Sequence, residues 1–431
     1  MPVFMQTFAL LATWSAAVIS ASSVRVSKYD PPTWNGPLSI YKTHAKYGVP
    51  ISPELSAAVR RAGFDTEKLN KRQQRQQQGS ATAYPYYGDT EWLMQVKVGT
   101  PPQFFNAQVD TGSSEFWVFS DQHPTAREAG HIVYSPSRSL TAAFIPGLSW
   151  NQTYASGNSA WGNQVYNNVV QLGDVVAQSQ AVLPATAASE GFVNSAFESL
   201  LGLDLLEYTA TLPIEARGPP NFFGTIKSSL PSPLFSMDLK YKKQSLFDFS
   251  VVPSNRYRGR VSWAPIHPVR AKGINYSRWN ITAFGYGIGD AKTVPLKPRT
   301  ITGVVDTGTT LLYLNKPIVE KYYSKVPGSR YNPLKAAWFY PCKISHLLPD
   351  FSFGVGPVGK AVTITIPGKY FNWSPNEVEN NECFGGLQES IDFKGGKASI
   401  FGTVAIKAVY VIFEDPRPAA NPRIGWAAKD V

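Results

Sequence analysis

Apolar residues fall at every second position in several stretches of the chain, which is the pattern of strands with one buried face. The alternation is clear in residues 92–98, 105–109 and 362–366. One segment differs because its apolar residues fall at helical spacing: Ile318, Val319, Tyr322, Tyr323 and Val326. This spacing predicts an amphipathic helix. The chain as a whole is predicted to be mostly β, with a few short helices.

The length of the chain points to two lobes. About 350 residues follow the glutamine-rich tract that ends at residue 78, which is more than one hydrophobic core usually serves. We therefore expect an N-terminal β lobe over residues 79–258 and a C-terminal β lobe over residues 259–431, joined near residues 250–265. The interface between two such lobes is a common place for an active site.

Two Asp-Thr-Gly triplets, at 110–112 and 306–308, each stand between two apolar runs. One triplet is expected by chance in about a tenth of chains of this length, and an ordinary turn after a strand would account for it. Two copies in matching surroundings, one in each predicted lobe, favour a pair of carboxylates that act together.

Paired carboxylates have a chemistry of their own. If Asp110 and Asp306 lie close together, they cannot both ionise, so they share one proton. The ionised member can take a proton from water while the protonated member donates to a carbonyl oxygen, which hydrolyses a peptide bond without a covalent intermediate. The residues expected to support the pair allow tight turns or carry hydroxyl groups: Gly112, Ser113, Gly308 and Thr309.

At these motifs the chain resembles the pepsin-like aspartic endopeptidases, and among them the secreted fungal enzymes of the penicillopepsin and aspergillopepsin type. The resemblance covers roughly residues 85–431 and includes further segments: 98–103, 200–203, 309–314, 318–323, 400–402 and 424–427. It implies a bilobal, mostly β acid-protease fold with the active site in the cleft between two barrel-like lobes. It also implies a monomeric hydrolase that cuts protein or peptide substrates at acid pH and needs no cofactor.

Residues 150–157 resemble the flap that closes over the cleft in this family. The resemblance implies that Tyr154 bonds to the indole of Trp117, and core packing is the other explanation for both aromatic residues. Further candidates for the flap and the substrate-binding wall are Ser156, Gly157, Phe197 and Tyr313. The aromatic members of this group predict a preference for bulky apolar side chains around the cut.

Five positions depart from the usual pattern of the family: Glu115, Ala155, Glu198, Ser199 and Thr403. We expect them to affect rate and pH optimum more than reaction type. Four of them, Ala155, Glu198, Ser199 and Thr403, are also the only support for an alternative, in which the chain is a catalytically inactive binding protein on the same scaffold. Both aspartates and their hydroxyl neighbours are present, which favours the enzyme.

Two N-terminal segments are predicted to be removed. Residues 1–21 hold an apolar stretch that ends in small residues, as signal peptides do, and a short hydrophobic anchor is the alternative. Residues 22–78 carry ten basic and four acidic residues and end in a polar glutamine tract, which predicts a propeptide. Its end is approximate, because processing after Lys71–Arg72 and self-cleavage near Gly79 are both compatible with the sequence.

A basic propeptide opposite an acidic cleft is expected to act as an intramolecular inhibitor. Its cations pair with carboxylates near neutral pH and are released when acid protonates those carboxylates. Lys46 and Tyr47 are the candidate plug. Cleavage of the signal peptide would leave a secreted, extracellular protein without a membrane contact.

The net charge of +11 is shared between the propeptide and the rest. Residues 79–431 keep 31 basic and 26 acidic residues of the totals of 41 and 30. Arg256, Arg258 and Arg260 alternate at period two, which predicts three guanidinium groups on one face of a strand. A solvated surface is the simplest interpretation, and contact with acidic substrates or cell-wall polyanions is the alternative. No recognisable nucleic-acid-binding module is visible, so nucleic acid is not an expected partner.

The two cysteines, Cys342 and Cys383, are expected to pair in an oxidising compartment, and free buried thiols are the alternative. The resemblance also implies this bridge. Four Asn-x-Ser/Thr sites are candidate glycan acceptors in a secreted chain: Asn151, Asn275, Asn280 and Asn372.

Other catalytic classes find little support in the sequence. The five histidines form no pair with metal-ligand spacing on a helix. The chain also lacks a Gly-x-Ser-x-Gly elbow and a glycine-rich phosphate loop. Metal and nucleotide are therefore not expected.

Overall fold

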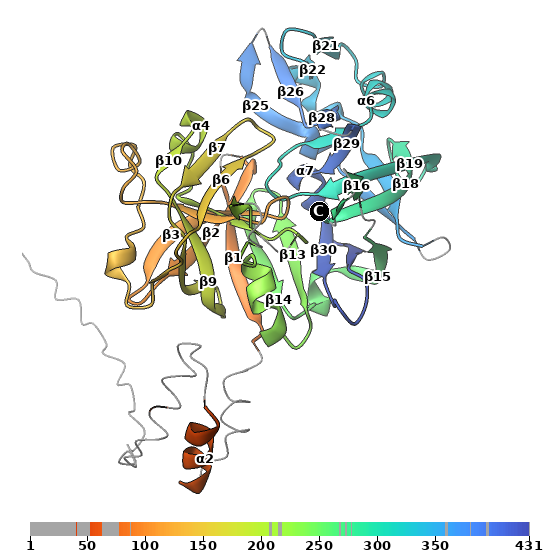
Figure 1. The fold of residues 1–431 in the computed structure, drawn as a ribbon. Helices are drawn as coiled ribbons and strands as arrows, with labels where there is room; N and C mark the ends of the chain where they lie inside the picture. Colours follow the sequence, from red (N-terminus) through yellow and green to blue (C-terminus); the bar gives the residue numbers. More distant parts are fainter. Residues whose placement is uncertain are drawn as a thin grey trace, which may run out of the picture. The chain divides into compact units, whose positions relative to one another are not determined.

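The computed structural model of the chain describes residue 40 and residues 52–62, 77–86, 88–206, 209–213, 218–266, 269–271, 274–276, 278–357, 361–379, 381–393 and 396–430. It divides into two compact units, Met1–Gln74 and Arg75–Val431 (Figure 1). No helix among the described residues is long and apolar enough to cross a membrane.

The first unit contains helix α2 (Pro53–Arg61). The hydroxyl of Ser52 accepts a hydrogen bond from the backbone N–H of Leu55 at the start of this helix. Glu54 lies in its first turn and basic residues lie in its last turn, a charge order that suits the helix dipole. The predicted signal peptide lies outside the described residues, as do Lys46 and Tyr47.

The second unit is built on a sheet of thirteen strands. Their order is β15 (Arg258–Pro265), β31 (Arg423–Ala428), β30 (Val409–Glu414), β13 (Leu234–Lys240), β14 (Lys243–Phe249), β1 (Gly79–Tyr86), β2 (Glu91–Val98), β3 (Gln103–Asp110), β11 (Ser199–Gly202), β4 (Phe116–Phe119), β9 (Val175–Ala185), β8 (Tyr166–Leu172) and β5 (Ala143–Phe144). Strand β2 also pairs with β8 and thereby closes a six-stranded barrel.

A second sheet of eight strands belongs to the C-terminal half. Its order is β24 (Val362–Ile366), β23 (Phe351–Val355), β18 (Asn280–Ile288), β19 (Lys297–Val305), β29 (Gly396–Phe401), β20 (Leu312–Leu314) and β27 (Leu387–Glu389), with β28 (Ile391–Phe393) paired to β29. The protein therefore has the mostly β, bilobal pepsin-like architecture expected from the sequence, with one closed barrel and one half-barrel.

Smaller elements complete the unit. Short sheets are formed by β10 (Ala187–Ala188), β7 (Ser159–Gly162), β6 (Ser149–Thr153) and β12 (Thr211–Leu212), by β16 (Val269–Ala271) and β17 (Ile274–Tyr276), and by β21 (Arg330–Asn332), β22 (Ala337–Pro341), β26 (Glu382–Gly385) and β25 (Asn372–Glu379). The α-helices are α4 (Glu190–Val193), α5 (Phe222–Ile226), α6 (Lys316–Tyr323) and α7 (Thr403–Ile406). Single 3-10 turns lie at Pro136–Arg138, Lys227–Ser229, Ser254–Arg256, Cys342–Leu347 and Gly368–Phe371.

The strongest local patterns of the sequence are confirmed. The alternating residues form β2, β3 and β24, and the segment with helical spacing forms α6, whose four apolar side chains are buried. One local prediction is wrong: the three arginines of 256–260 do not share a strand face. Arg256 lies in a 3-10 turn and its guanidinium contacts the buried carboxylate of Asp248 at 2.8 Å. Gly259 has a φ of +70°, which interrupts the extended backbone.

The two lobes share one sheet. Strands β13 and β14 precede residue 258, while β15, β30 and β31 follow it, and all five are hydrogen-bonded neighbours in the order of the first sheet. Ring contacts across this sheet include the stacked pair of Phe235 and Phe413, with ring centroids 4.8 Å apart. The predicted boundary near 258 thus falls inside a continuous sheet.

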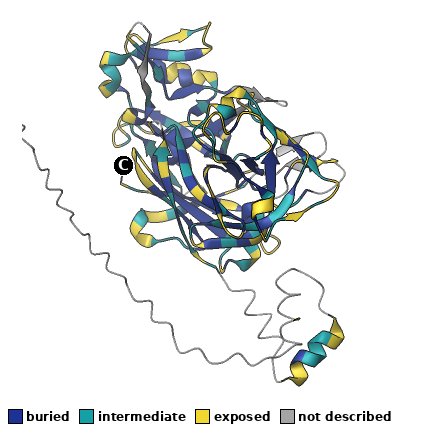
Figure 2. Cartoon of the chain, turned by 90° about the vertical axis from the view of Figure 1, so that its left-hand side faces the viewer, coloured by how far each residue is buried: buried dark blue, intermediate teal, exposed yellow. Residues whose placement is uncertain are grey.

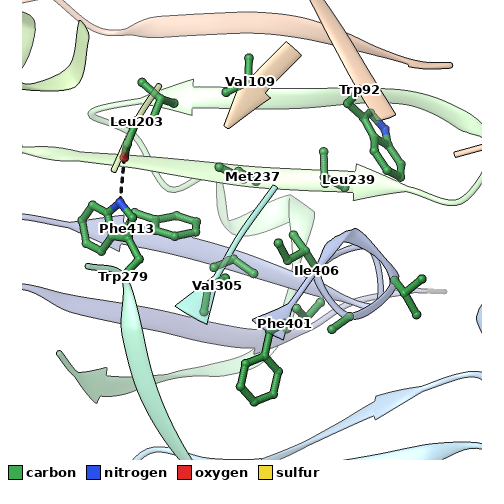
Figure 3. Close-up of a cluster of buried hydrophobic side chains, with 14 of the residues drawn as sticks. Trp92, Val109, Leu203, Met237, Leu239, Trp279, Val305, Phe401, Ile406 and Phe413 are labelled. Atoms are coloured by element: carbon green, nitrogen blue, oxygen red, sulfur yellow. Dashed lines mark hydrogen bonds between the residues drawn. The ribbon is translucent and has the colours of Figure 1, made fainter. Parts of the chain in front are cut away.

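The hydrophobic core also runs through the junction of the lobes. Figure 2 shows buried residues following the strands of this unit, with exposed residues mostly in loops and at edges. In Figure 3, the fully buried indole of Trp279 donates to the backbone carbonyl of Leu203 over 2.8 Å. This bond joins the start of β18 to the residue that follows β11, so both halves of the chain hold the same region.

Candidate active site

Each Asp-Thr-Gly loop lies at the end of a strand and is held by a second strand that threads beneath it. In the first lobe, β11 runs parallel to β3 and antiparallel to β4, and the N–H of Leu203 donates to the carbonyl of Asp110 over 2.7 Å. In the second lobe, β29 runs parallel to β19 and antiparallel to β20, and the N–H of Asp306 donates to the carbonyl of Phe401 over 3.1 Å. The two loops therefore have the same support.

Glycine is required where each threading strand passes its loop. A Cβ atom on Gly202 would lie 2.5 Å from the carbonyl oxygen of Ser113, and one on Gly402 would lie 2.3 Å from that of Leu311. Both distances are shorter than a carbon atom tolerates. The apolar-apolar-Gly segments in the sequence are thus explained by the close approach of two backbones.

The two threonines of the triplets tie the loops to each other. The N–H of Thr111 donates to Oγ1 of Thr307 and the N–H of Thr307 donates to Oγ1 of Thr111, each over 3.0 Å. Each hydroxyl donates in turn to the other lobe, that of Thr111 to the carbonyl of Val305 and that of Thr307 to the carbonyl of Val109. These threonines were not among the residues predicted from the sequence, although their place in the middle of both triplets was the available signal.

Each aspartate is oriented by the residues that follow it. Oδ1 of Asp110 accepts the N–H of Gly112 over 2.7 Å, and its Oδ2 accepts the hydroxyl of Ser113 over 2.5 Å. The second loop repeats this arrangement. Oδ1 of Asp306 accepts from the N–H of Gly308 over 2.9 Å, and Oδ2 accepts from the hydroxyl of Thr309 over 2.7 Å. The structure therefore brings all six of these predicted residues together.

The two carboxyl groups face each other across the junction of the loops. A Cβ on Gly308 would lie 2.4 Å from Oδ1 of Asp110, and one on Gly112 would lie 2.7 Å from Cγ of Asp306. Burial, the charge of Asp110 and a hydrogen bond with Asp110 raise the pKa of Asp306 well above its usual range. A pair of this kind, here called the dyad, holds one proton over a wide range of acid pH.

Comparison with known proteins agrees with this geometry. Residues 91–429 match the family model for eukaryotic aspartyl proteases. The chain belongs to this family.

Among its relatives, this aspartyl protease is similar to three fungal enzymes. It is 35% identical to endothiapepsin of Cryphonectria parasitica, over 92% of this chain and 87% of that protein. It is 37% identical to penicillopepsin-3 of Penicillium janthinellum, over 81% of each chain. It is 32% identical to aspergillopepsin-1 of Aspergillus flavus, over 94% of this chain and 89% of that protein. The chain is accordingly an aspartic-type endopeptidase, a hydrolase.

The segment that resembles the flap of the protease is a β-hairpin. Strands β6 and β7 pair in register, and at the tip the N–H of Tyr154 donates to the carbonyl of Asn158 over 2.8 Å. Ser156 and Gly157 lie exposed at this tip, where Gly157 has a φ of +83°. The indole of Trp117 donates to the hydroxyl of Tyr154 over 2.9 Å, as the resemblance implied.

An aromatic cluster packs beneath the hairpin. The ring of Phe192 lies 5.2 Å from that of Trp117 and 5.3 Å from that of Tyr154, and Phe197 lies 6.2 Å from Trp117. Phe192 comes from the short helix α4 and was not among the residues predicted from the sequence. Tyr313 lies in the other lobe, on β20, opposite Ile400 of β29. It is thus on the same strand pair that supports the second loop.

The residues that depart from the family pattern bind backbone groups. Glu115 is buried and accepts from the N–H groups of Ser114 and Ala210, and its burial raises its pKa. Glu198 is also buried and accepts from the N–H of Asn106 over 2.7 Å. The hydroxyl of Thr403 donates to the carbonyl of Thr310 over 3.3 Å.

Two departures make no such bond. Ala155 is exposed at the hairpin tip, and the buried hydroxyl of Ser199 has no hydrogen-bond partner among the described residues. None of the five residues blocks the aspartate pair. The departures therefore do not favour an inactive binding protein.

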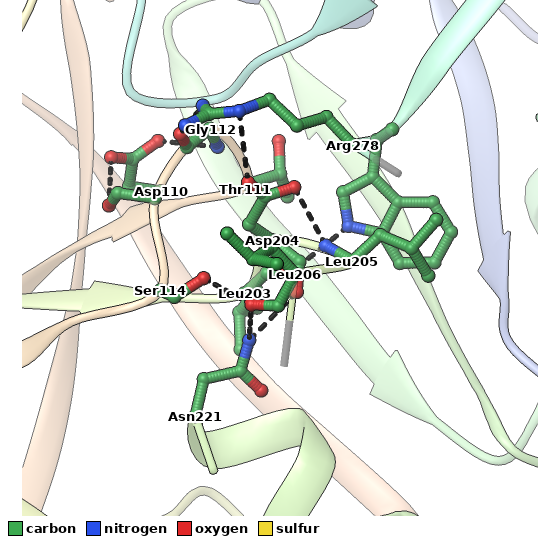
Figure 4. Close-up of polar contacts among 12 residues, drawn as sticks. Asp110, Thr111, Gly112, Ser114, Leu203, Asp204, Leu205, Leu206, Asn221 and Arg278 are labelled. Atoms are coloured by element: carbon green, nitrogen blue, oxygen red, sulfur yellow. Dashed lines mark hydrogen bonds and ion pairs between the residues drawn. The ribbon is translucent and has the colours of Figure 1, made fainter. Parts of the chain in front are cut away.

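Another acidic residue, Asp204, lies beside the first loop and was not among the residues predicted from the sequence. Asp204 is 1% exposed, and its Oδ1 accepts the N–H of Leu205 over 2.7 Å (Figure 4). Arg278 faces it with Nε 3.6 Å from Oδ2, and Nη1 of Arg278 donates to the carbonyl of Gly112 over 2.6 Å. Burial is the main cause that raises the pKa of Asp204 to about 7. No local pattern indicates this contact, because 74 positions separate the two residues in the chain.

The cysteines and the candidate glycan sites have clear positions. Cys342 and Cys383 form a disulfide. Asn151 is exposed on β6, whereas Asn280 is 8% exposed within β18, a position that does not accommodate a glycan. Asn372 accepts from the hydroxyl of Tyr340 over 2.7 Å. The side chain of Asn275 lies outside the described part of the chain. Among the residues described, no three His, Cys, Asp or Glu side chains are grouped to hold a metal ion.

Proposed function

We propose that this chain is a secreted endopeptidase that works at acid pH through Asp110 and Asp306. The observation that carries the proposal is the arrangement of the two carboxyl groups. Each has both oxygens held by its own loop, and each lies against the glycine of the other loop. Substrate would bind where the hairpin tip, with Tyr154, covers this pair.

In the proposed reaction Asp306 holds the shared proton and Asp110 is ionised. Asp110 takes a proton from a water molecule, whose oxygen attacks the carbonyl carbon of the peptide bond. Asp306 donates its proton to the carbonyl oxygen, which gives a neutral tetrahedral diol. Asp110 then passes its proton to the amide nitrogen, and the C–N bond breaks while one hydroxyl of the diol returns its proton to Asp306. A carboxylic acid and an amine leave, and the starting protonation of the pair is restored. The raised pKa of Asp306 supports its assignment as the proton donor.

The proposed substrates have bulky apolar side chains around the cut. The support is the half-buried rings of Tyr154 and Tyr313, which offer an apolar wall near the two loops. The buried rings of Trp117, Phe192 and Phe197 pack under Tyr154. Burial of an apolar side chain against such a wall supplies binding energy of about 25 cal/mol per Å². Charged side chains at the same position would lose their hydration without a partner.

We also propose that the enzyme is a monomer made as a zymogen, with residues 22–78 as an intramolecular inhibitor. The position of Gln77 bears on where it is processed. Its side-chain amide donates to the carbonyl of Val176 and accepts the N–H of Val176, and its backbone N–H donates to the carbonyl of Ser229. A cut next to Gly79 would remove these bonds from the protease unit. Processing upstream of Gln77, after Lys71–Arg72, keeps them and is the route we favour, which shortens the proposed propeptide to residues 22–72.

The proposal is tested with the activated enzyme, the variants Asp110→Asn and Asp306→Asn, and the control Asp430→Asn, which changes an exposed carboxylate paired with Arg258. Cleavage of a denatured protein is followed at several acid pH values, with and without a statine-type inhibitor. We expect cleavage by the parent and the control, inhibition by the statine compound, and a loss of at least about 1,000-fold in each dyad variant. A dyad variant that is folded and cuts at the parental rate would show that the assignment is wrong.

A further inference from the structure

Arg278 places a cationic group next to the carboxylate pair. The guanidinium of Arg278 donates through Nη1 to the carbonyl of Gly112, whose N–H in turn donates to Oδ1 of Asp110. A Cβ on the same glycine would lie 2.7 Å from Cγ of Asp306. Arg278 is thus linked through one residue to both acidic groups, and 46% of its side chain is exposed.

The position of Arg278 is fixed by its neighbours in the chain. Trp279 is fully buried and its indole donates to the carbonyl of Leu203. The N–H of Asn280 donates to the carbonyl of Arg278 over 2.6 Å. The backbone beneath the guanidinium is therefore anchored in the junction of the lobes, which lowers the entropy cost of using this side chain to bind a ligand.

Arg278 has little compensation for its charge under acidic conditions. Its one acidic partner within ion-pair distance, among the residues described, is Asp204. Burial raises the pKa of Asp204 to about 7, so this carboxyl is protonated in acid. The other acidic groups that face this region are Glu115, whose pKa burial raises, and the dyad, which shares one proton. Arg417, which donates to the carbonyl of Leu205, is already paired with Asp415.

The guanidinium also keeps hydrogen-bonding capacity. Its Nη1 is used by Gly112 and its Nε faces Asp204, while Nη2 has no hydrogen-bond partner among the described residues. Arginine binds carboxylates in a planar, two-pronged geometry. A peptide lying over the aspartate pair would pass close to this exposed group.

We infer that Arg278 is a specificity-determining residue that binds a carboxylate of the peptide substrate beside Gly112. This inference rests on the proposed function, because it concerns the peptide that the dyad cuts. The carboxylate is supplied either by an Asp or Glu side chain at one position near the cut or by the C-terminus of a short product-like peptide. Apolar side chains around the cut and one acidic group beyond them then define the preferred substrate.

The experiment uses matched peptides around one cleaved bond, with Glu or Gln placed at each position in turn, and with a free or amidated C-terminus. The assay is run at about pH 5.5, above the usual pKa of a substrate Glu, which is about 4.3. The variant is Arg278→Gln, which keeps a donor for Gly112. The control is Arg330→Gln, because Arg330 is 51% exposed and forms a surface ion pair with Glu382.

We expect the parent and the control to prefer Glu to Gln about three- to five-fold in kcat/KM at one position, the size of effect expected for a half-exposed ion pair. Arg278→Gln is expected to bring this Glu/Gln ratio to about one, because its kcat/KM falls more on the Glu peptide than on the Gln peptide. A preference that follows only the free C-terminus identifies that carboxylate as the ligand. An unchanged Glu preference in Arg278→Gln overturns the inference, as does an equal loss on both peptides, since Arg278 would then only position the loop.

Binding of the same peptide pairs to Asp306→Asn separates this inference from the proposed function. A fluorescence titration with this variant measures the preference for Glu without cleavage. If the parent cuts no peptide but binding still favours Glu in an Arg278-dependent way, the proposed reaction fails and the inference holds. If binding shows no such preference, the inference fails whatever the parent cuts.

Discussion

Thr111 and Thr307 bind each other in the same way in both directions. Each backbone N–H donates over 3.0 Å to the hydroxyl of the other threonine, and each hydroxyl donates to a carbonyl at the end of the opposite strand. All four bonds are buried and cross between the lobes. The separation of the two carboxyl groups is therefore set by these bonds, which lie directly beneath Asp110 and Asp306.

Replacement of Thr307 by Val is expected to reduce both stability and activity. Valine has nearly the same shape but leaves the N–H of Thr111 and the carbonyl of Val109 without partners in a buried site. We expect a loss of about 2–4 kcal/mol in the free energy of unfolding, from two unsatisfied buried groups. The loss is measured by urea unfolding at acid pH, and kcat is measured in the same samples.

Two further variants sharpen this test. Thr307→Ser keeps the hydroxyl and should retain most of the activity. Thr302→Val changes an exposed threonine of β19, the strand that leads into the second loop. Its hydroxyl lies 3.2 Å from that of Thr282, and the change should alter stability by less than about 0.5 kcal/mol. Equal stability of Thr307→Val and Thr302→Val would contradict a structural role for the reciprocal pair.

The features that the sequence predicted well are those with a local signal. Strand β2 follows from alternation over seven residues, helix α6 follows from five apolar residues at helical spacing, and both aspartates follow from a repeated triplet. In each case the residues that produce the signal are neighbours along the chain, so tertiary packing adds to a preference that is already present.

The features that the sequence did not reveal depend on contacts between distant segments. Arg278 reaches Gly112 over 166 positions, and nothing near either residue indicates it. Phe192 joins the aromatic cluster from a helix of four residues, too short for a periodic pattern. The arginines of 256–260 show the opposite case, in which a local pattern was present but the predicted strand face did not form. Arg256 lies in a turn and pairs with the buried carboxylate of Asp248.

The hydrogen bond between Trp117 and Tyr154 leads to a prediction about the hairpin tip. Tyr154→Phe keeps the ring contact with Phe192 but removes the acceptor for the indole N–H, so the tip is held less firmly over the dyad. We expect kcat/KM to fall about five- to tenfold, equivalent to the loss of one hydrogen bond of about 1 kcal/mol. The measurement is steady-state kinetics with one peptide substrate.

Tyr331→Phe is the matched control for this change, because Tyr331 is 38% exposed on β21 and far along the chain from the hairpin. It should leave kcat/KM unchanged. If Tyr154→Phe is as active as this control, the hydroxyl has no part in holding the hairpin.

The disulfide leads to a prediction about stability alone. Cys342 and Cys383 are 41 positions apart, and the bridge restricts the unfolded chain. Replacing both by Ala is expected to cost about 3–4 kcal/mol, the entropy of closing a loop of this length. Neither aspartate loop nor the hairpin lies within residues 342–383, so kcat should be preserved well below the unfolding temperature. An unchanged thermal midpoint would contradict the expected contribution.

The buried carboxyl of Asp204 makes stability depend on pH in a defined direction. Its pKa is about 7 in the folded chain and 3.8 for an unperturbed group, so the folded state binds more protons than the unfolded state between these values. Stability is therefore fully present below about pH 3.8 and is lost as pH rises through 7. Asp204→Asn cannot ionise and should escape this loss, since its side-chain oxygen still accepts from the N–H of Leu205.

We expect Asp204→Asn and the parent to unfold at similar temperatures at pH 4, and the variant to be more stable at pH 8. The gain is bounded at about 4 kcal/mol, because each pKa unit corresponds to 1.36 kcal/mol. Asp306 contributes a loss of the same sign, because its pKa is also raised. At pH 8 the variant should therefore be less stable than at pH 4, but its loss of stability should be smaller than that of the parent. Asp430→Asn, at an exposed ion pair, should follow the parent at both pH values. If Asp204→Asn loses as much stability between pH 4 and pH 8 as the parent does, the pH dependence comes from the dyad and not from Asp204.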